Sequence, residues 1–303
     1  MTANTCFRLN DGRLLSYREW GKPSGRPVFY AHGTPGSSQE GAFFHHQAYQ
    51  AGLRWVVVDR PGVGDSSPKE DLTLSDYPQD IASLADHLGI QRFAVVGWSS
   101  GVPHSLACVK MLPERITDAI ALAGYTNFGE MQQAKQLLLS VSQRGPKIAE
   151  ISPLLFRTLM QLLRLAEQHM PGLYLRFIET SSTDRDIALL RQPDMMQMFL
   201  RNQDAAFAQG IEGAVSDLML QYKDWQFALH SLTLPVEFYQ GTEDRFVPWQ
   251  FARHMAERVP KSQLNLLEGE GHMFPLRPAF QQLFMGRLNS TADRLVSVAR
   301  KLG

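Results

Sequence analysis

The chain has 303 residues, 44% of them hydrophobic, which is enough to bury one large core or two ordinary ones and excludes a disordered protein. Its 30 basic and 30 acidic residues balance, so the chain has no excess of positive charge that would favour nucleic acid or anionic lipid as a partner. No apolar run approaches the roughly 18 residues that span a bilayer, and the N-terminus lacks a signal-peptide pattern. We therefore expect a cytoplasmic protein with no membrane span and a small-molecule partner. The oligomeric state is not predicted.

Seven segments have the apolar, β-branched and aromatic composition of strands, and each is bounded by turn residues. Some of them, such as the runs VVVD and AVVG, are apolar at every position, which is typical of strands covered on both faces in a parallel sheet. In chain order the predicted strands lie within residues 13–20, 27–33, 54–60, 92–99, 116–124, 234–241 and 263–271.

Helices are expected between these strands, and the clearest covers residues 75–89. Ser75 or Asp76 can cap it, Pro78 suits its first turn, and Gly89 ends it. Alternating strands and helices predict an α/β fold with a mostly parallel sheet flanked by helices.

The strand pattern stops between residues 127 and 230, where the sequence is rich in leucine and methionine and has a helical pattern. Because the strand pattern resumes afterwards, we predict a helical cap inserted into one core, which comprises residues 1–126 and 231–303. Such a cap would cover the carboxyl ends of the strands, where open α/β sheets bind ligands. A plain helical domain without a lid role is the alternative.

The sharpest motif is Gly97-Trp98-Ser99-Ser100-Gly101, which follows a predicted strand and opens a helical run. A G-x-S-x-G sequence in this setting is typical of a serine nucleophile on a tight strand-to-helix turn. The glycines leave room for that turn, because a Cβ there would strike neighbouring backbone. Ser99 is therefore the predicted nucleophile.

A serine hydroxyl needs a base, and the base needs a carboxylate that orients it. Of nine histidines, His272 is the best candidate, since it lies in a glycine-rich loop after the last predicted strand. Asp244 follows the preceding strand and should reach the same edge of the sheet, and its neighbour Glu243 is the rival. The sequence predicts the triad Ser99, Asp244 and His272.

Two backbone N–H groups should stabilise the oxyanion. One is that of Ser100, at the start of the helix after the nucleophile, and the other is that of Thr34, in the loop after an early strand. Trp98, His104 and Met273 are the predicted substrate-binding residues, although packing is the alternative role for His104.

These motifs together resemble the α/β-hydrolase superfamily over nearly the whole chain. The segments that carry the resemblance are HGTPG at 32–36, DRPGVGDS at 59–66, GWSSG at 97–101, GTEDRFVP at 241–248 and GEGH at 269–272. The resemblance implies the same triad and the same oxyanion donors. It also implies that residues 59–66 form a structural loop, so we assign Arg60 and Asp65 no chemistry. Val102 departs from the glycine that many relatives carry there, which bears on helix packing or pocket shape.

The triad predicts hydrolysis of carboxylic esters through an acyl-enzyme, and the cap rich in leucine, methionine and phenylalanine favours small to medium apolar substrates. We expect no cofactor and no metal, because no group of His, Cys and carboxylates has the spacing of metal ligands. Relatives that open epoxides or remove halogens carry aspartate at the position of Ser99, so those reactions are not expected. A peptidase of the proline iminopeptidase type or a carbon–carbon hydrolase would use the same groups, although Thr34 replaces a glycine that is frequent in the peptidases. The alternative outside enzymes is a ligand receptor on the hydrolase fold.

Overall fold

The computed structural model describes residues 3–138 and 144–289. Eight strands form one sheet in the order β1-β2-β4-β3-β5-β6-β7-β8. Their bounds are β1 Thr5–Arg8, β2 Leu14–Gly21, β3 Arg26–Ala31, β4 Leu53–Val58, β5 Phe93–Trp98, β6 Ile116–Leu122, β7 Val236–Gly241 and β8 Ser262–Leu267.

Most neighbouring strands are parallel, and only the pairs β1–β2 and β2–β4 are antiparallel. Each of the seven predicted segments overlaps one strand, with ends that differ by a few residues. The eighth strand, β1, has four largely exposed residues and therefore lacks the apolar pattern that identified the others. The predicted α/β fold with a mostly parallel sheet is confirmed.

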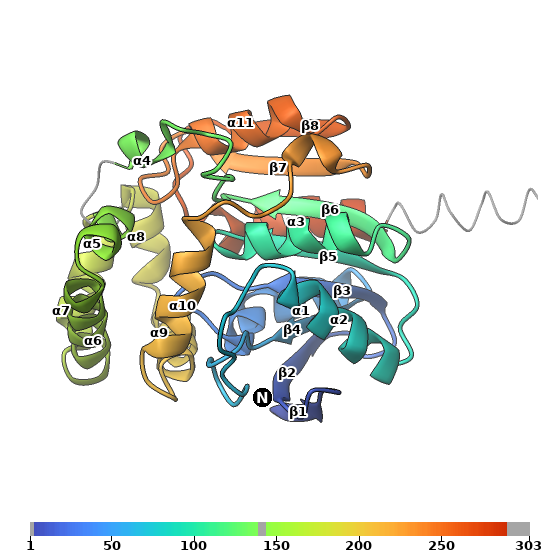
Figure 1. Cartoon of the computed structure of the whole chain (residues 1–303), viewed down its shortest axis with the longest axis horizontal. Helices are drawn as coiled ribbons and strands as arrows, with labels where there is room; N and C mark the ends of the chain where they lie inside the picture. The colour runs from blue at the N-terminus through green and yellow to red at the C-terminus, as the bar shows by residue number, and fades with distance from the viewer. Residues whose placement is uncertain (1–2, 139–143, 290–303) are drawn as a thin grey trace, which may run out of the picture.

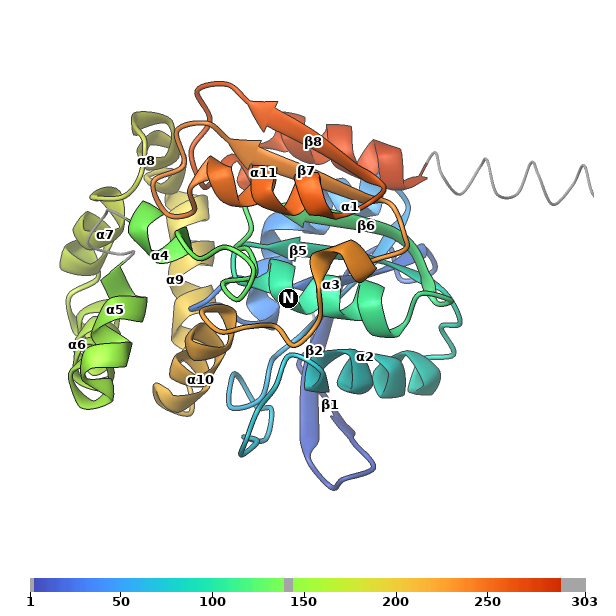
Figure 2. The same ribbon diagram turned by 45° about the horizontal axis from the view of Figure 1, so that its top comes forward.

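Helices cover both faces of the sheet, as the continuously apolar strands predicted (Figures 1 and 2). One face packs on α2 (Asp76–His87), α3 (Gly101–Met111) and α11 (Trp249–Arg258). The other face packs on η1 (Ser38–Phe44), α1 (His45–Gln50) and a helix over residues 278–289. Alternate residues of a strand join different clusters: Val95 lies in the first and Val96 in the second.

Helix α2 matches the prediction for residues 75–89 apart from its cap. Ser75 occupies the N-cap position without a side-chain hydrogen bond, whereas Asp76 Oδ2 accepts from the N–H of Thr73 at 2.8 Å. Gly89 lies just after the helix with a φ of +67°. A positive φ of this kind favours glycine, which explains the end of the helix there.

Residues 127–230, here called the helical segment, connect the neighbouring strands β6 and β7. Figure 1 shows most of these helices grouped at one end of the sheet. The division into a core and an inserted cap stays a prediction. Among the described residues, no helix has both the length and the apolarity needed to cross a membrane. The helices are α4 Ala134–Leu137, α5 Gly145–Ile151, α6 Pro153–His169, α7 Pro171–Glu179, α8 Asp184–Leu190, α9 Pro193–Ala206 and α10 Glu212–Gln221.

Candidate active site

Ser99 lies on a sharp turn between β5 and α3. Its φ is +56°, a left-handed conformation that a residue with a side chain seldom adopts and that requires close packing to persist. The flanking glycines make the turn possible: a Cβ at Gly101 would lie 2.0 Å from the carbonyl oxygen of Ala31, and one at Gly97 would lie 2.6 Å from that of Gly101. The strained turn leaves Ser99 half-buried at the end of the strand.

His272 and Asp244 form a buried pair beside this turn. Nδ1 of His272 lies 2.7 Å from Oδ2 of Asp244, and their side chains are 7% and 0% exposed. Ser99 and His272 line the same cavity. Ser99 and His272 make no hydrogen bond to each other in the described chain, and such nucleophile–base bonds often align only in the complex with substrate.

The Asp244 carboxylate is fixed by three further donors. Oδ1 accepts from the N–H groups of Phe246 and Val247, both at 2.8 Å, and Oδ2 accepts from the Gln240 amide at 3.0 Å. Gln240 is fully buried and had no sequence signal of its own. The rival Glu243 is exposed, so the structure brings Asp244 and not Glu243 to His272.

Two aromatic rings lie next to the imidazole. The ring centroid of Trp98 lies 5.6 Å from that of His272, and the centroid of Phe246 lies 5.1 Å from it. Trp98 and Met273 are each 5% exposed, and both line the cavity. Their predicted contact with substrate is therefore sterically available, and it stays a prediction.

The predicted oxyanion donors face no competing acceptor. In the described ranges, neither the Thr34 N–H nor the Ser100 N–H donates a hydrogen bond to another group of the chain. Thr34 lies in the cavity wall beside Ser99. The N–H of Gly33, by contrast, donates to Oε1 of Glu40 at 2.9 Å and is already engaged. The Thr34 and Ser100 groups thus remain available for an oxyanion.

Arg60 holds the loop of Thr34 from beneath. Its guanidinium donates to the carbonyl oxygens of His32 at 2.7 Å and of Gly33 at 3.1 Å, and to the Thr34 hydroxyl at 2.8 Å. The same guanidinium pairs with Asp217 of α10 at 2.6 Å, and the Thr34 hydroxyl also donates to that carboxylate. No chemical role is predicted for Arg60, and these contacts give it none. Its support of the Thr34 loop had no signal in the sequence.

Asp217 is a buried carboxylate of the helical segment. Burial, the largest single influence, would raise its pKa, but the charges of Arg60 and His104 and the hydrogen bonds from Arg60 and Thr34 together outweigh burial, so the pKa of Asp217 is lowered. Nε2 of His104 lies 3.2 Å from its Oδ1, while Nδ1 of His104 lies 3.0 Å from the Ser100 carbonyl oxygen. His104 is not among the residues that line the cavity, and its contacts are those of the packing role; its contact with substrate stays a prediction.

The cavity in front of Ser99 has a volume of about 800 Å³. Its floor is formed by loops of the sheet, and its walls come from the helical segment. Several wall residues of α6 and α7 are partly exposed, which leaves the cavity open on that side. The apolar wall residues include Leu159, Met160, Leu163, Met170, Tyr174, Phe177, Phe199 and Phe207.

Glu40 is the one carboxylate among the described residues that line this cavity. Its Oε1 accepts from the Tyr30 hydroxyl at 2.7 Å as well as from Gly33, and Oε2 lies 3.4 Å from the Asn202 amide nitrogen. Burial raises the pKa of Glu40 to about 7, so the carboxyl is partly protonated at neutral pH. No motif pointed to this residue.

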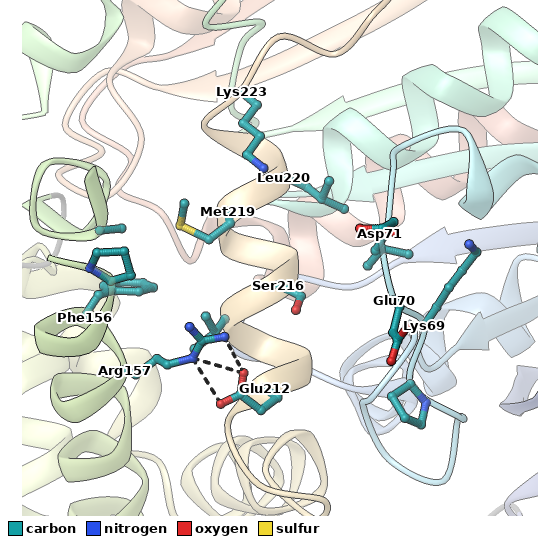
Figure 3. Close-up of a pocket in the computed structure, with 15 residues that line it drawn as sticks. Lys69, Glu70, Asp71, Phe156, Arg157, Glu212, Ser216, Met219, Leu220 and Lys223 are labelled. Carbon is teal, nitrogen blue, oxygen red and sulfur yellow. Dashed lines mark hydrogen bonds and ion pairs between the residues drawn. The ribbon is translucent and has the colours of Figure 1, made fainter. Parts of the chain in front are cut away.

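A second cavity, of about 770 Å³, lies between α10, α6 and the loop at residues 68–72 (Figure 3). An exposed ion pair between Arg157 and Glu212 crosses it, at 2.8 Å. None of the predicted site residues lines it. Within residues 3–138 and 144–289, no group of three or more His, Cys, Asp or Glu is arranged to hold a metal ion.

The Val102 side chain packs closely against Gly124 in the core. Its side chain is fully buried, and a Cβ at Gly124 would lie 2.4 Å from it. The departure from the relatives' glycine therefore affects the packing of α3 against the chain after β6 and leaves the cavity wall unchanged.

Comparison with known proteins relates the chain to several hydrolases. It is 27% identical over 288 residues to a proline iminopeptidase of Xylella fastidiosa strain Temecula1, covering 87% of this chain and 88% of that protein. It is 28% identical over 234 residues to a putative carbamate hydrolase of Cronobacter turicensis, covering 75% of each. A proline iminopeptidase of Arabidopsis thaliana is 33% identical over 120 residues, which is 30% of that protein and 38% of this chain.

Solved structures share the fold at low sequence identity. A thermophilic esterase from Thermogutta terrifontis superposes with a TM-score of 0.68 at 18% identity, covering 95% of this chain and 99% of that one. An enol-lactonase from Burkholderia xenovorans LB400 has a TM-score of 0.67 at 15% identity, with 95% and 100% covered. The family model for the alpha/beta hydrolase fold matches residues 26–277. The chain therefore belongs to the alpha/beta hydrolase fold family.

Proposed function

We propose that this protein is a serine hydrolase that cleaves carboxylic esters with an apolar acyl or alcohol group through an acyl-enzyme on Ser99. The observation that carries the proposal is the cavity of about 800 Å³ that Ser99, His272 and Thr34 share, with walls of leucine, methionine and phenylalanine. Apolar walls around a few convergent polar groups are typical of sites that bind small apolar substrates.

In the proposed acylation step, Ser99 Oγ attacks the ester carbonyl while Nε2 of His272 takes the hydroxyl proton. Asp244 keeps the proton on Nδ1 and stabilises the imidazolium that forms. The carbonyl oxygen becomes an oxyanion, which the N–H groups of Thr34 and Ser100 stabilise. His272 then gives its proton to the leaving alcohol, and the acyl group remains on Ser99.

In the proposed deacylation step, His272 removes a proton from a water molecule that attacks the acyl carbonyl. The same two N–H groups hold the second oxyanion, and collapse releases the acid and returns the proton to Ser99. Arg60 supports both steps indirectly because it fixes the carbonyl groups of the Thr34 loop. Rigid donors matter here, since losing one oxyanion donor lowers turnover by roughly 100- to 1,000-fold.

A proline iminopeptidase activity is the second candidate, favoured by the 27% identity to the Xylella fastidiosa relative over most of both chains. An aminopeptidase must hold the free ammonium group of its substrate, for which a carboxylate is the natural partner. Glu40 is the one carboxylate among the described wall residues, and it is hydrogen-bonded to the chain and has a pKa raised by burial to about 7. A partly neutral, engaged carboxyl suits an ammonium poorly, which supports the ester over the peptide.

The test is incubation with a fluorophosphonate, peptide mapping of the label, and turnover of p-nitrophenyl esters and of a proline arylamide, with Ser99→Ala as control. We expect label on Ser99, repeated turnover of esters and little cleavage of the arylamide. If the arylamide is the better substrate and Glu40→Gln abolishes its cleavage alone, the peptidase replaces the esterase.

Three other outcomes reject hydrolysis of esters. Label on Ser99 with release of a single equivalent of product would favour a ligand receptor that acylates once. Cleavage of neither substrate, with turnover of a vinylogous diketone, would favour the carbon–carbon hydrolase. Absence of both label and turnover would remove Ser99 from the proposal altogether.

A further inference from the structure

The first turn of α8, in the helical segment, contacts the loop that carries His272. Asp186 is fully buried there, with 0% of the residue exposed. Its Oδ2 accepts from the N–H of His272 at 3.1 Å, and its Oδ1 accepts from the N–H of Met273 at 3.2 Å. Figure 2 shows α8 beside the loops at the ends of β7 and β8. One carboxylate therefore binds two consecutive N–H groups of a segment 86 residues away.

The loop is shaped to receive this carboxylate. A Cβ at Gly271 would lie 1.9 Å from Oδ2 of Asp186, so only glycine leaves room for the contact. A second contact from the same turn reinforces it, since Arg185 pairs with Glu270 at 3.0 Å. The backbone on both sides of Gly271 is thus anchored to α8.

These bonds complement those that fix the imidazole itself. Asp244 sets the direction of Nδ1, and the ring contacts Trp98 and Phe246, but none of these contacts holds the His272 main chain. A general base must keep its nitrogen within about 0.5 Å of its productive position relative to the nucleophile to be effective. Something must therefore fix the backbone from which the ring projects.

We propose that Asp186 is a positioning residue for His272, which it holds from the helical segment through the N–H groups of His272 and Met273. The inference rests on the proposed function, since it assigns His272 the role of general base. It makes the helical segment part of the catalytic apparatus as well as a wall of the cavity.

Asp186 has a second role that could by itself explain its presence. It forms a capping box with Thr183, whose hydroxyl accepts from the Asp186 N–H at 3.2 Å, while Oδ2 of Asp186 accepts from the Thr183 N–H at 3.3 Å. Capping stabilises a helix by about 1 kcal/mol and requires no contact with the His272 loop. The two roles are separable by substitution.

The decisive variant is Asp186→Asn. An amide offers one accepting oxygen instead of two, and its NH2 group would face the second N–H as a donor. We expect kcat per titrated active site to fall by about 10- to 100-fold, because a small misplacement of a catalytic group has effects of this size. The KM should stay within about twofold, because Asp186 does not line the cavity.

Two matched variants serve as controls. Thr183→Ala removes the capping hydroxyl but leaves both bonds from Asp186 to the loop, so it should lower the melting temperature without changing kcat per active site. Asp184→Asn removes an exposed carboxylate from the same turn and should change neither. A kcat for Asp186→Asn equal to that of Thr183→Ala would reduce Asp186 to a helix cap and overturn the proposal.

Hydrogen exchange of residues 269–274 in the purified chain gives a readout that needs no turnover. We expect faster exchange in Asp186→Asn and unchanged exchange in the two controls. Unchanged exchange in Asp186→Asn overturns the proposal even if kcat falls. If the wild type neither binds the fluorophosphonate nor turns over esters, the proposed function fails, while the exchange still decides whether Asp186 holds the loop.

Should Asp186→Asn not fold, Asp186→Glu replaces it. Glutamate at this position keeps the capping box, since it is the preferred residue there, but its longer side chain has no space beside Gly271. We expect the same loss of kcat per active site with a nearly normal melting temperature. Full activity of this variant would overturn the proposal.

Discussion

The sheet and the helical segment differ in how fully their apolar side chains are buried. Every residue of β5 is buried, and the strand leads directly to Ser99. In α6 the apolar side chains are split: Leu154 is 75% exposed and Leu162 is 56% exposed, whereas Phe156 and Met160 are buried. The sheet loops carry the groups proposed to react, and the helical segment supplies apolar surface.

The helical segment also reaches the sheet loops through two buried carboxylates. Asp217 of α10 joins Arg60 and the Thr34 hydroxyl, and Asp186 of α8 joins the N–H groups of the His272 loop. Each carboxylate thus supports one half of the proposed machinery, the oxyanion donors or the base. A region that carries none of the groups proposed to react can therefore still hold the loops on which those groups lie.

The largest effect should follow a change in the sheet loops, Asp244→Asn. An amide in place of the triad carboxylate stabilises the wrong tautomer of the imidazole, so kcat for a p-nitrophenyl ester should fall by about 10,000-fold. The neighbouring exposed residue provides the control, and Glu243→Gln should retain activity within about twofold. Comparable losses in both variants would contradict the assignment of Asp244.

The next largest effect should follow Asp217→Ala in the helical segment. Arg60 would be left as an unpaired buried charge, which lowers the free energy of unfolding by about 3–5 kcal/mol. Urea denaturation measures the change. Glu212→Ala on the same helix breaks an exposed pair with Arg157 and should lower it by less than about 1 kcal/mol (Figure 3). Equal losses would mean that burial does not distinguish the two pairs.

A pH effect of intermediate size should come from Glu40. Its pKa is raised from 4.5 to about 7, so the folded state holds a proton that the unfolded chain releases between these values. The contribution to stability is complete below pH 4.5 and is lost as the pH rises through about 7, by about 3 kcal/mol in all. Glu40→Gln should remove this loss.

The measurement is urea denaturation of wild type and Glu40→Gln at several pH values from 4.5 to 8.5. Other buried carboxyls are common to both proteins, so their effects cancel in the difference. A difference between the two unfolding free energies that stays constant with pH would show that Glu40 titrates near its ordinary value.

The smallest effect should come from the cavity wall. Leu163→Trp would fill space in the cavity and should reduce the preference for long over short acyl esters by about tenfold. Leu165→Trp on the same helix is the control, since Leu165 is 39% exposed and does not line the cavity. If both variants shift the chain-length profile alike, the wall of the helical segment does not contact the acyl chain.

The sequence predicted the sheet closely because its signals are local. Continuous apolar runs mark strands covered on both faces, and the glycines beside Ser99 mark a turn that admits no Cβ. The strand β1 escaped prediction because it is short and exposed. The pairing of His272 with Asp244 followed from the rule that parallel strands end at one edge, and the structure brings the two side chains within 2.7 Å.

The contacts that hold the site could not be predicted in the same way. Gln240, Glu40 and Asp186 are ordinary polar residues in sequence, and their roles depend on burial and on partners far along the chain. His104 illustrates the same limit, since its place one turn after Ser99 suggested the cavity while its ring faces Asp217.

The fold, the turn at Ser99 and the candidates for base and acid could thus be predicted from the sequence alone, because strand patterns and steric demands on glycine act over a few residues. The sequence alone does not indicate which carboxylates are buried, which of them contact the Thr34 and His272 loops, or which leucines face the cavity. Those properties arise from packing between segments that are distant in sequence, where burial changes the strength of each charge and hydrogen bond.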